Sequence, residues 1–454
     1  MFSISSAKRM VFIFYWCFMV FWGLAPAPVQ AEETELSLDQ VVEIALKRNP
    51  GIVSSEQQME GARARVTQNT AAYWPQVSGV ASYDRLHTPV LGSTTSFSNP
   101  VKRDFNNYNA KLSASQYLYD FGQTTGLVEE SRQNLSASRE GLASTLADVL
   151  QQVKKAYYEV LKNQRLVDVA LETLNSREKH LEQATAFYQV GLRPKIDMVR
   201  AELDVANARQ SLIQARFNRD IAFVNLENVL GGRPVAGPYR VQDATGRPLR
   251  PKQLEPLMEE ALKARSEVLQ LEAQIRAAEA HLHSSQGKYW PSLTSVARYG
   301  LENTEFPLSE SWQVGAQMSW SIFNGFQTQG EVAEGKARIK QTRAQLEQVR
   351  LQVIQQVSQA YLGLDSAEQS IVTAEVTVRQ AQENMDLAEG RYRTGVGDAI
   401  ENTDAQVSLT SAKNTLVQAR YIYLQALVDL DRAMGRGPSP AETPQTKPFP
   451  WTAR

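Results

Sequence analysis

The sequence predicts a mixed α and β membrane protein built from two internal repeats, each joining a strand hairpin to long coiled-coil helices. A glycine turn at Gly395 matches a similar turn at Gly191, about 204 residues upstream. Two matching turns between helices indicate a repeat architecture. Apolar and polar residues alternate in one part of each repeat, as they do in strands. In another part a heptad pattern runs from Val332 to Ala388, which is typical of coiled coils.

Composition and charge exclude one class of partner. The chain has 454 residues, of which 43% are apolar and 21% charged, and this is the composition of a folded protein. Its formal net charge is -1, with acidic and basic residues mixed along the sequence. A nucleic-acid-binding protein would carry a basic stripe, so we expect no nucleic-acid partner.

The N-terminus has the pattern of a secretory signal peptide. Lys8 and Arg9 precede an apolar run at 11–24, and small residues lead to Ala31. We expect cleavage after about Ala31. The alternative is an uncleaved membrane anchor, but roughly fourteen apolar residues are too few to span a bilayer, which needs about twenty.

The single cysteine, Cys17, lies inside that apolar run. It follows bulky aromatic residues and lacks the small neighbours of a lipoprotein processing site, so we expect a chain that is not lipidated. The mature protein would then have no cysteine. That excludes disulfides, thiolate metal ligands and cysteine catalysis.

Short helical patterns open both repeats. An amphipathic segment at 36–50 matches a similar segment at 254–265. Each is followed by a second helix, at 51–73 in repeat 1 and at 266–289 in repeat 2. Both second helices end in Tyr-Trp-Pro, where the proline stops the helix. The expected divisions are a signal peptide at 1–31, repeat 1 at 32–232, a linker or equatorial segment at 233–251, repeat 2 at 252–438, and a C-terminal tail at 439–454.

Period-two alternation predicts one strand hairpin in each repeat, at about 76–120 and 292–323. The expected strands are ten to eleven residues long and carry aromatic residues near their ends, as strands that cross a bilayer do. A soluble sheet packed on the helices is the alternative. Because four strands cannot close a barrel and an open edge cannot lie in lipid, the chain would supply part of a shared barrel.

The longest helices are expected at 123–189 and 327–394, and each would reach about 100 Å at a rise of about 1.5 Å per residue. Return helices are expected at 194–230 and 398–434. A sustained heptad repeat predicts left-handed supercoiling between neighbouring helices. The heptad positions change from bulky aliphatic residues to alanine at Ala156 and Ala360, so we expect the helices to approach each other more closely toward the glycine turns.

Together these features resemble the TolC-like outer membrane efflux proteins, also called outer membrane factors. The resemblance covers essentially the whole mature chain, and it depends on the order of elements and on the paired turns 190–192 and 394–396. It implies a trimer in which a 12-stranded outer-membrane β-barrel, with four strands per chain, is continuous with a long periplasmic α-helical coiled-coil barrel.

The resemblance also implies a function and partners. The protein would be the passive exit duct of a tripartite efflux or type I secretion system, lying in the cell outer membrane and extending into the periplasm. Its partners would be two further copies of itself, a periplasmic adaptor (membrane fusion protein), an inner-membrane pump or ABC transporter, and outer membrane lipid. The sequence does not identify the cargo.

Candidate gate residues follow from matching positions to the family. Glu401 and Asp404 match an acidic ring at the periplasmic entrance that selects cations, and Asp197 and Tyr392 match the closing latch. The plain alternative for the two acids is stabilisation of a helix N-terminus. The chain departs from the family at Gly397, where the best-known member has an arginine.

The basic residues Arg391 and Arg393 are candidates to replace that arginine. The turns themselves are candidates for adaptor docking, through residues that are either glycine or exposed apolar side chains. These residues are Val190, Gly191, Leu192, Gly395 and Val396. Because a helix end needs a left-handed glycine in any case, a purely structural role for the turns stays open.

No pattern in the sequence supports catalysis or a cofactor. His281 and His283 are two residues apart on a helix and point to different sides, which argues against a shared metal. Gly231-Gly-Arg-Pro234 lacks the lysine of a phosphate-binding loop, and neither a nucleophile elbow nor HExxH occurs. We therefore expect no enzyme, cofactor or metal. The alternative functions are a periplasmic coiled-coil structural or adaptor protein without a pore, and an outer-membrane enzyme.

Overall fold

The computed structural model describes residues 34–90, 101–235, 237–243 and 253–436. The expected signal peptide, the C-terminal tail and residues 236 and 244–251 of the linker lie outside the described residues. The helices are α2 (Leu38–Arg48), α3 (Pro50–Thr70), α4 (Gln123–Gln189), α5 (Lys195–Val229), α6 (Glu255–Ala264), α7 (Ser266–Gly287), α8 (Gln327–Arg393) and α9 (Ala399–Ala433), with a 3-10 turn, η1 (Ala71–Tyr73). The strands are β1 (Thr34–Leu36), β2 (Gln76–Val90), β3 (Val101–Tyr119), β4 (Tyr239–Val241), β5 (Ser292–Asn303) and β6 (Ser309–Ser319).

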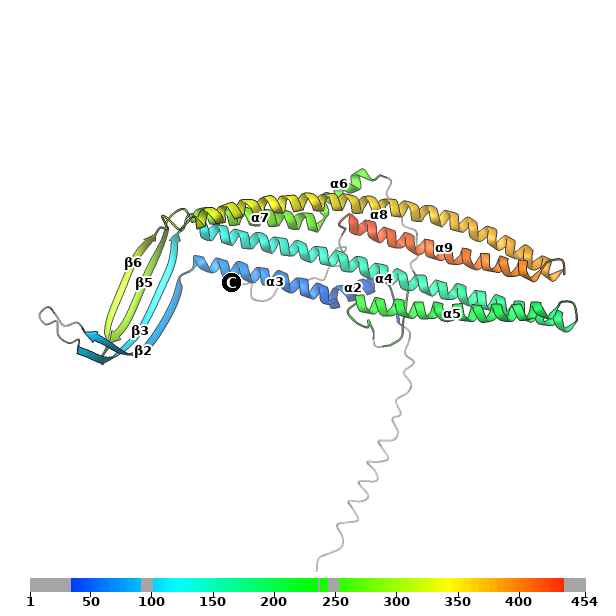
Figure 1. The fold of residues 1–454 in the computed structure, drawn as a ribbon, viewed down its shortest axis with the longest axis horizontal. Helices are drawn as coiled ribbons and strands as arrows, with labels where there is room; N and C mark the ends of the chain where they lie inside the picture. The colour runs from blue at the N-terminus through cyan, green and yellow to red at the C-terminus, as the bar shows by residue number, and fades with distance from the viewer. Residues whose placement is uncertain (1–33, 91–100, 236, 244–252, 437–454) are drawn as a thin grey trace, which may run out of the picture.

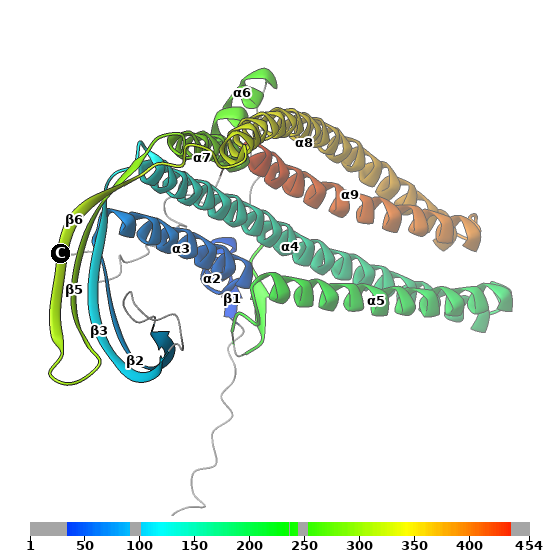
Figure 2. The ribbon, with the colours of Figure 1, turned by 60° about the vertical axis from the view of Figure 1, so that its left-hand side comes forward.

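The molecule is elongated, with a sheet at one end and two helical hairpin tips at the other (Figure 1). The sheet is antiparallel with strand order β2-β3-β5-β6, so the hairpins of the two repeats are joined through β3 and β5. Figure 2 shows the four strands curving together away from the helices. Strands β2 and β6 form the two edges of this sheet.

The register gives the sheet one apolar and one polar face. Residues that pair directly lie on the same face, and Leu112 pairs with Tyr299, which pairs with Trp312. The adjacent row on the other face holds Lys111 and Gly300. Lys111 forms an ion pair with Glu302 at 2.9 Å between Nζ and Oε2, so charged groups share the polar face.

The first hairpin is longer than the sequence predicts. Strand β2 has 15 residues and β3 has 19, against the ten or eleven expected, because the ladder continues from Gln76 and Ser115 to Val90 and Val101. Backbone pairing does not depend on apolar side chains, so it continues where the alternating pattern fades. Strand β6 instead ends at Ser319, before the expected end at about residue 323, and the Trp320 indole N–H donates to the Tyr289 carbonyl.

The linker also forms structure that the sequence analysis does not anticipate. Strand β4 pairs in parallel with β1, at Thr34 with Tyr239 and Leu36 with Val241. The buried Tyr157 hydroxyl from α4 donates to the Gln242 carbonyl at 2.6 Å. These contacts fasten the segment between the repeats to the middle of the molecule.

Helices α4 and α8 have 67 residues each, or about 100 Å. Helix α4 packs along α3 and then α5, and α8 packs along α7 and then α9 (Figure 1). The two shorter helices that pack along each long helix meet end to end, α3 with α5 and α7 with α9. A Cβ atom on Gly231 would come within 2.6 Å of the Arg48 carbonyl oxygen, and one on Gly435 within 3.0 Å of the Ala264 carbonyl. Glycine therefore permits the end-to-end stacking that gives each repeat two rods.

The predicted heptad positions form most of the seam between the helices. Those that the structure buries in α8 are Val332, Ile339, Leu346, Val353, Ala367, Ala374, Ala381 and Ala388, and Ala360 is half-buried. The alanine positions Ala367, Ala374, Ala381 and Ala388 therefore belong to the buried seam, in the part of α8 nearer the turn. Among the helices in the described ranges, none is both long enough and apolar enough to span a membrane.

A charged network ties the two repeats together near mid-length. Arg265 is buried, donates to the Arg432 and Ala433 carbonyls that end α9, and pairs with Glu267 at 2.9 Å. Arg432 pairs with Asp148 of α4 at 2.6 Å. Burial alone would raise the pKa of Glu267, but hydrogen bonds from the two arginines lower it to about 2. This carboxylate is therefore charged at any physiological pH.

The fully buried Leu364 offers a test of the seam. We expect Leu364→Ala to lower the free energy of unfolding by about 2–5 kcal/mol, because it removes apolar area and leaves a cavity. The exposed Gln352 is the control, and Gln352→Ala should change little. Urea unfolding followed by circular dichroism measures both, and equal stability of the two variants would contradict the packing.

Candidate functional site

The candidate site lies where the α4–α5 and α8–α9 hairpins end. Gly191 and Gly395 adopt left-handed φ angles of 75° and 79°, and the backbone N–H groups after them return to the last helical turn. Leu192 donates to the Phe187 carbonyl at 2.9 Å, and Val396 to that of Arg391 at 3.1 Å. Glycine is needed at both turns because a left-handed residue closes each helix.

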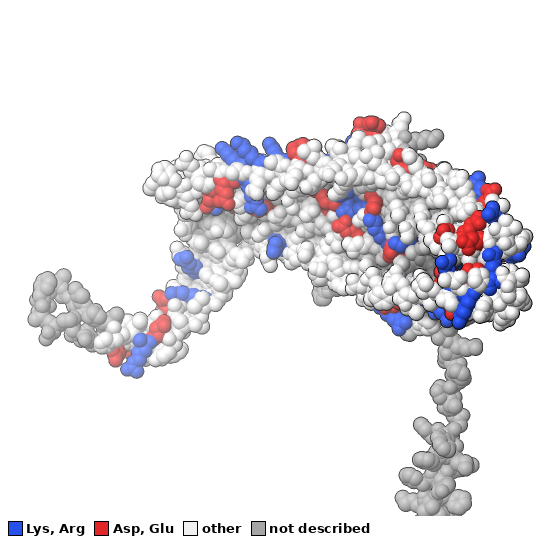
Figure 3. Space-filling model, turned by 45° about the vertical axis from the view of Figure 1, so that its right-hand side comes forward, with Lys and Arg blue, Asp and Glu red and all other residues white. Residues whose placement is uncertain are grey.

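The turns expose the apolar side chains that the sequence analysis singles out. Val190, Leu192 and Val396 are 68%, 70% and 76% exposed. A Cβ atom on Gly191 or Gly395 would meet nothing within 4 Å, so these turns face open space. Figure 3 shows acidic and basic side chains gathered around the same end of the molecule. The tips therefore present apolar points inside a charged surface.

Tyr392 lies at the centre of the interface between the hairpins. Its side chain is fully buried, with ring centroids 5.0 Å from His180 and 6.0 Å from Phe187. Its hydroxyl has no hydrogen-bond partner among the described residues. Burial raises the pKa of Tyr392, and the nearby charge of Asp197 raises it further. The equivalent Tyr188 of repeat 1 is 40% exposed, so the repeats differ here.

Arg193 joins the two tips. Its guanidinium carbon lies 5.2 Å from the Tyr392 ring centroid, and its Nη2 donates to the Gly397 carbonyl at 2.7 Å. A cation over an aromatic ring gains electrostatic attraction. Arg193 and Gly397 are 204 positions apart, the offset that relates Tyr188 to Tyr392, so they are equivalent positions of the two repeats.

Gly397 itself has no room for a side chain. A Cβ atom there would lie 2.9 Å from the Arg391 Cβ and from the Tyr392 backbone nitrogen. Of the two arginines that the sequence suggests as substitutes, Arg391 pairs with Glu401 at 3.3 Å and Arg393 is exposed. The arginine that contacts the Tyr392 ring is Arg193, from the turn of repeat 1.

His180 connects α4 with α9 beside the same tyrosine. It is buried, and its Nδ1 lies 3.0 Å from Nδ2 of Asn402, whose Oδ1 has no partner among the described residues. Since the Asn402 amide N–H₂ can only donate, Nδ1 accepts and the imidazole is neutral. Burial lowers the pKa of His180, and the charge of Arg177 lowers it further.

Arg177 is itself held by a carboxylate from the partner helix. It pairs with Asp204 of α5 at 3.0 Å, and Asp204 also accepts from the Thr403 hydroxyl at 3.1 Å. The carboxylates of Asp204, Asp197 and Glu389 partly offset the effects of burial and Arg177 on the pKa of His180. We call His180, Phe187, Arg193, Tyr392 and Asn402 the tip cluster.

The predicted acids fall into two environments. Asp197 is buried in the first turn of α5, near Tyr392, whereas Glu401 and Asp404 are exposed in the first turns of α9. The single chain thus brings Asp197 and Tyr392 into one interface and leaves the other two acids at the surface. Among the described residues, no cluster of three or more His, Cys, Asp or Glu side chains could hold a metal ion.

Sequence reasoning misses His180, Arg193 and Asn402. The repeat offset was the available signal for Arg193, because it places an arginine at the position equivalent to Gly397. Nothing in the local pattern marks His180 or Asn402, which lie 222 residues apart and meet only in the folded chain.

Comparison with known proteins identifies the family. The model for outer membrane efflux proteins matches residues 41–232 and 257–436, which are parts of both repeats. The chain belongs to the outer membrane efflux protein family. The resemblance to TolC-like proteins is therefore confirmed, as is the expectation that the chain forms an efflux channel and is not an enzyme.

Relatives of this outer membrane efflux protein include both efflux and secretion proteins. The probable efflux pump outer membrane protein TtgC of Pseudomonas putida is 26% identical over 412 residues, which are 88% of this chain and 83% of that protein. The alkaline protease secretion protein AprF of Pseudomonas aeruginosa is 24% identical over 395 residues, or 84% and 81%.

Solved structures confirm the mixed α and β fold. The outer-membrane channel OprN superimposes with a TM-score of 0.78 at 21% identity, covering 88% of this chain and 90% of that one. The Campylobacter jejuni CmeC outer membrane channel superimposes with a TM-score of 0.79 at 16% identity, covering 90% of each chain. The efflux protein therefore has the fold of known outer-membrane channels.

The buried, neutral His180 predicts a pH-dependent contact between the hairpins. The closed interface lowers its pKa, so as pH falls through the ordinary value of about 6.5 the separated state takes up the proton first. The contact should therefore be strongest above about pH 7 and weaken below pH 6. Hydrogen exchange of the tip amides at pH 7.5 and 5.5, corrected for intrinsic rates, measures this.

His180→Gln should remove the pH dependence, because the amide does not titrate in this range. His281, which contacts Glu130 at 2.8 Å in another part of the molecule, supplies the control variant His281→Gln. A pH dependence that survives in His180→Gln would refute the assignment.

Proposed function

We propose that three copies of this efflux protein form a passive outer-membrane exit duct, closed at the helix tips and opened when a periplasmic adaptor and an inner-membrane pump engage. The observation that carries the proposal is an open four-stranded sheet, with an apolar and a polar face, that continues into helices of about 100 Å. We also infer export by a signal peptide cleaved after about Ala31, without lipidation.

The free sheet edges support a shared barrel. In lipid, the unpaired backbone groups of edge strands β2 and β6 would be unsatisfied, so spanning sheets are closed. If the β6 edge of one copy pairs with the β2 edge of the next, three copies give the twelve strands expected from the family resemblance. The apolar face of the sheet then faces lipid and the polar face lines the pore.

Exposed apolar stripes on the helices support the same assembly. Helix α5 and helix α8 each carry a stripe of large apolar side chains that are exposed in the described part of the chain, and stripes of this kind mark protein interfaces. In α5 they are Ile196, Val199, Leu203, Ile213, Phe217, Ile221 and Val224; in α8 they are Leu351, Leu362, Val372, Val376 and Leu387. The two stripes lie on different repeats, so contact between α5 of one copy and α8 of the next would close a ring.

The partners follow from the systems that relatives serve. TtgC is named for an efflux pump and AprF for alkaline protease secretion, so relatives serve both kinds of system. We infer that the exposed turns at Gly191 and Gly395 receive an adaptor, because they combine exposed apolar side chains with open space. The cargo is chosen by the pump and differs among relatives.

We infer that the tip cluster, with Asp197, holds the duct closed. Arg193 ties the tip of repeat 1 to the Gly397 carbonyl of repeat 2, and Tyr392 fills the space between them. Asp197 is the buried carboxylate available to the unpaired Tyr392 hydroxyl. Separation of the hairpins would expose Tyr392 and His180 and break the Arg193 hydrogen bond.

The exposed acids would act only in the assembly. Threefold symmetry would repeat Glu401 and Asp404 around one axis, where about six carboxylates would attract cations. We predict that Glu401→Ala with Asp404→Ala weakens cation selectivity and block by divalent ions. Reversal potentials in salt gradients across planar bilayers measure selectivity, and unchanged potentials would count against an acidic ring.

Loss of the tip contacts should make the closed duct leak. We predict a several-fold higher resting conductance for Arg193→Ala, because it removes the hydrogen bond to the Gly397 carbonyl and the cation over the Tyr392 ring. We predict the same for Asp197→Ala and Tyr392→Phe, because each removes one partner of the hydrogen bond that we propose the Tyr392 hydroxyl forms with Asp197 in the closed duct. The exposed Arg393 gives a control of the same charge change, and Arg393→Ala should conduct like the wild type. Single-channel recording measures this, and equal resting conductance of Arg193→Ala and Arg393→Ala would exclude Arg193 from the latch.

A further inference from the structure

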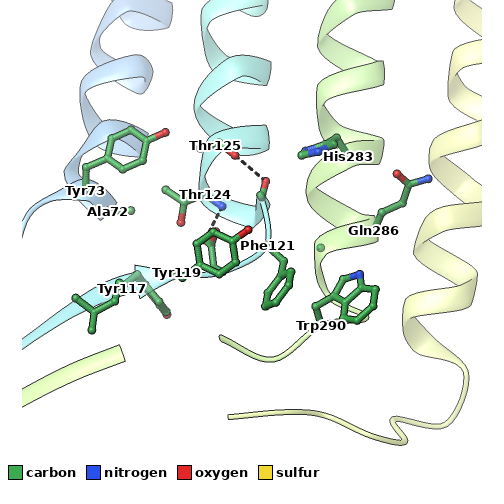
Figure 4. A pocket seen from close by; sticks show the side chains of 14 residues that line it. Ala72, Tyr73, Tyr117, Tyr119, Phe121, Thr124, Thr125, His283, Gln286 and Trp290 are labelled. Carbon is green, nitrogen blue, oxygen red and sulfur yellow. Dashed lines mark hydrogen bonds between the residues drawn. The ribbon is translucent and has the colours of Figure 1, made fainter. Parts of the chain in front are cut away.

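A cavity of about 540 Å³ lies where the first hairpin joins the helices. It is lined by the ends of η1 and α7, by the end of β3 and by the start of α4 (Figure 4). Cavities of this size hold small ligands or the polar part of a larger one. It is remote from the tip cluster, at the opposite end of α4.

The cavity lies at the end of the apolar face of the sheet. Tyr119 pairs with Leu293, which pairs with Met318, so these three residues share a face with Trp312. Phe121 packs edge-on against Tyr119, with ring centroids 4.7 Å apart, and stacks on Trp290 at 5.4 Å. The aromatic wall of the cavity therefore continues the surface that contacts lipid, at the level where strands give way to helices.

A neighbouring copy is not placed to cover these rings. These rings lie at the end of β3 and just before β5, the two inner strands, whereas copies would meet at the outer strands β2 and β6. Trp290 and Tyr119 are nevertheless more than half exposed, at 57% and 59%. Exposed aromatic residues at a membrane boundary are covered by lipid, since their rings are apolar and their polar atoms reach the headgroups.

The charge of the lining favours a cationic lipid headgroup over an anionic one. It contains one carboxylate, that of Asp120, and no lysine or arginine. Asp120 is nine-tenths buried, and its Oδ2 accepts the Thr124 backbone N–H at 2.7 Å. An anionic headgroup would find no cation here. An ammonium group would find both a carboxylate and aromatic faces that attract cations.

Polar groups on the other side of the cavity suit a phosphate or ester. His283 projects from α7 toward the start of α4, and Gln286 lies one turn further along α7 (Figure 4). His283 lies so close to Gly122 that a Cβ atom there would be 2.4 Å from its Cε1. Gly122 also has a left-handed φ of 89°, so glycine alone allows this packing. Imidazole, amide and hydroxyl donors can all bind phosphoryl or ester oxygens.

We propose that this junction cavity binds the headgroup of an amine-bearing phospholipid, phosphatidylethanolamine, from the periplasmic leaflet of the outer membrane. The ammonium lies against Phe121 and Trp290 near Asp120, and the phosphate lies toward His283 and Gln286. The acyl chains extend along the apolar face of the sheet. The site does not depend on the gate at the helix tips.

The second repeat provides a matched comparison. At the same offset of 204, Asp120 corresponds to Asn324, and the turn there places Phe326 in a left-handed conformation with φ 68°. Asn324 supports this turn through a 2.7 Å hydrogen bond to Thr328, so asparagine is compatible with the fold. Asp120→Asn therefore removes the charge by copying a residue that the chain already uses. Phe326→Ala is the aromatic control, because Phe326 does not line the cavity.

Lipid retention by the full-length protein tests the site. The protein is placed in nanodiscs with equal amounts of phosphatidylethanolamine and phosphatidylglycerol that have the same acyl chains. After transfer to detergent, native mass spectrometry counts the retained lipids. We expect about one phosphatidylethanolamine per chain, with retention weakened about 2- to 30-fold in Trp290→Ala, the range for loss of a cation–π contact. Retention should also weaken in Asp120→Asn, because this variant removes the carboxylate that attracts the ammonium. Phe326→Ala should retain lipid like the wild type.

Assembly and bilayer conductance show that each variant is folded. Equal retention of the two lipids by the wild type, or preference for phosphatidylglycerol, would overturn the proposal. So would undiminished retention in both Trp290→Ala and Asp120→Asn. If the variants lose lipid but conduct normally, the site is confirmed independently of the gate.

Discussion

The unsatisfied edges of a four-stranded sheet are the constraint on which the rest of this structure depends. Among the described strands, the edge strands β2 and β6 each have one side without a pairing strand. The hydrocarbon core of a bilayer has no water that could form hydrogen bonds with the backbone groups there. We propose that further copies close the sheet, which would bring the helices of neighbouring copies side by side. The exposed apolar stripes of α5 and α8 would then be covered by a neighbouring copy.

In the proposed assembly, the end opposite the barrel would be the gate. Helices of about 100 Å separate the sheet from the two hairpin tips, and the tip cluster occupies the interface between these tips. The cluster combines a buried neutral histidine, a phenol without a hydrogen-bond partner among the described residues, and an arginine that contacts a backbone carbonyl and an aromatic ring. These contacts hold the hairpins together with few strong bonds, as the proposed opening and closing of the duct would require.

Local signals explain which parts of the fold the sequence predicts. Gly191, Gly395 and Pro194 mark helix ends because their backbone preferences act locally, and the heptad pattern predicts the seam because burial follows its period. The first hairpin is predicted, but the extra length of its strands and the β1–β4 pair are not, because backbone hydrogen bonding leaves little trace in the side-chain pattern. Arg193 and His180 depend on contacts across 204 and 222 residues, which only the folded chain creates.

The number of chains in the purified particle tests the central claim most directly. Native mass spectrometry of the protein, released intact from detergent micelles, gives that number without reference to any mutation. Closing the sheet with four strands from each copy predicts a complex of three identical chains. A stable monomer or dimer would leave the β2 and β6 edges open and would contradict the account.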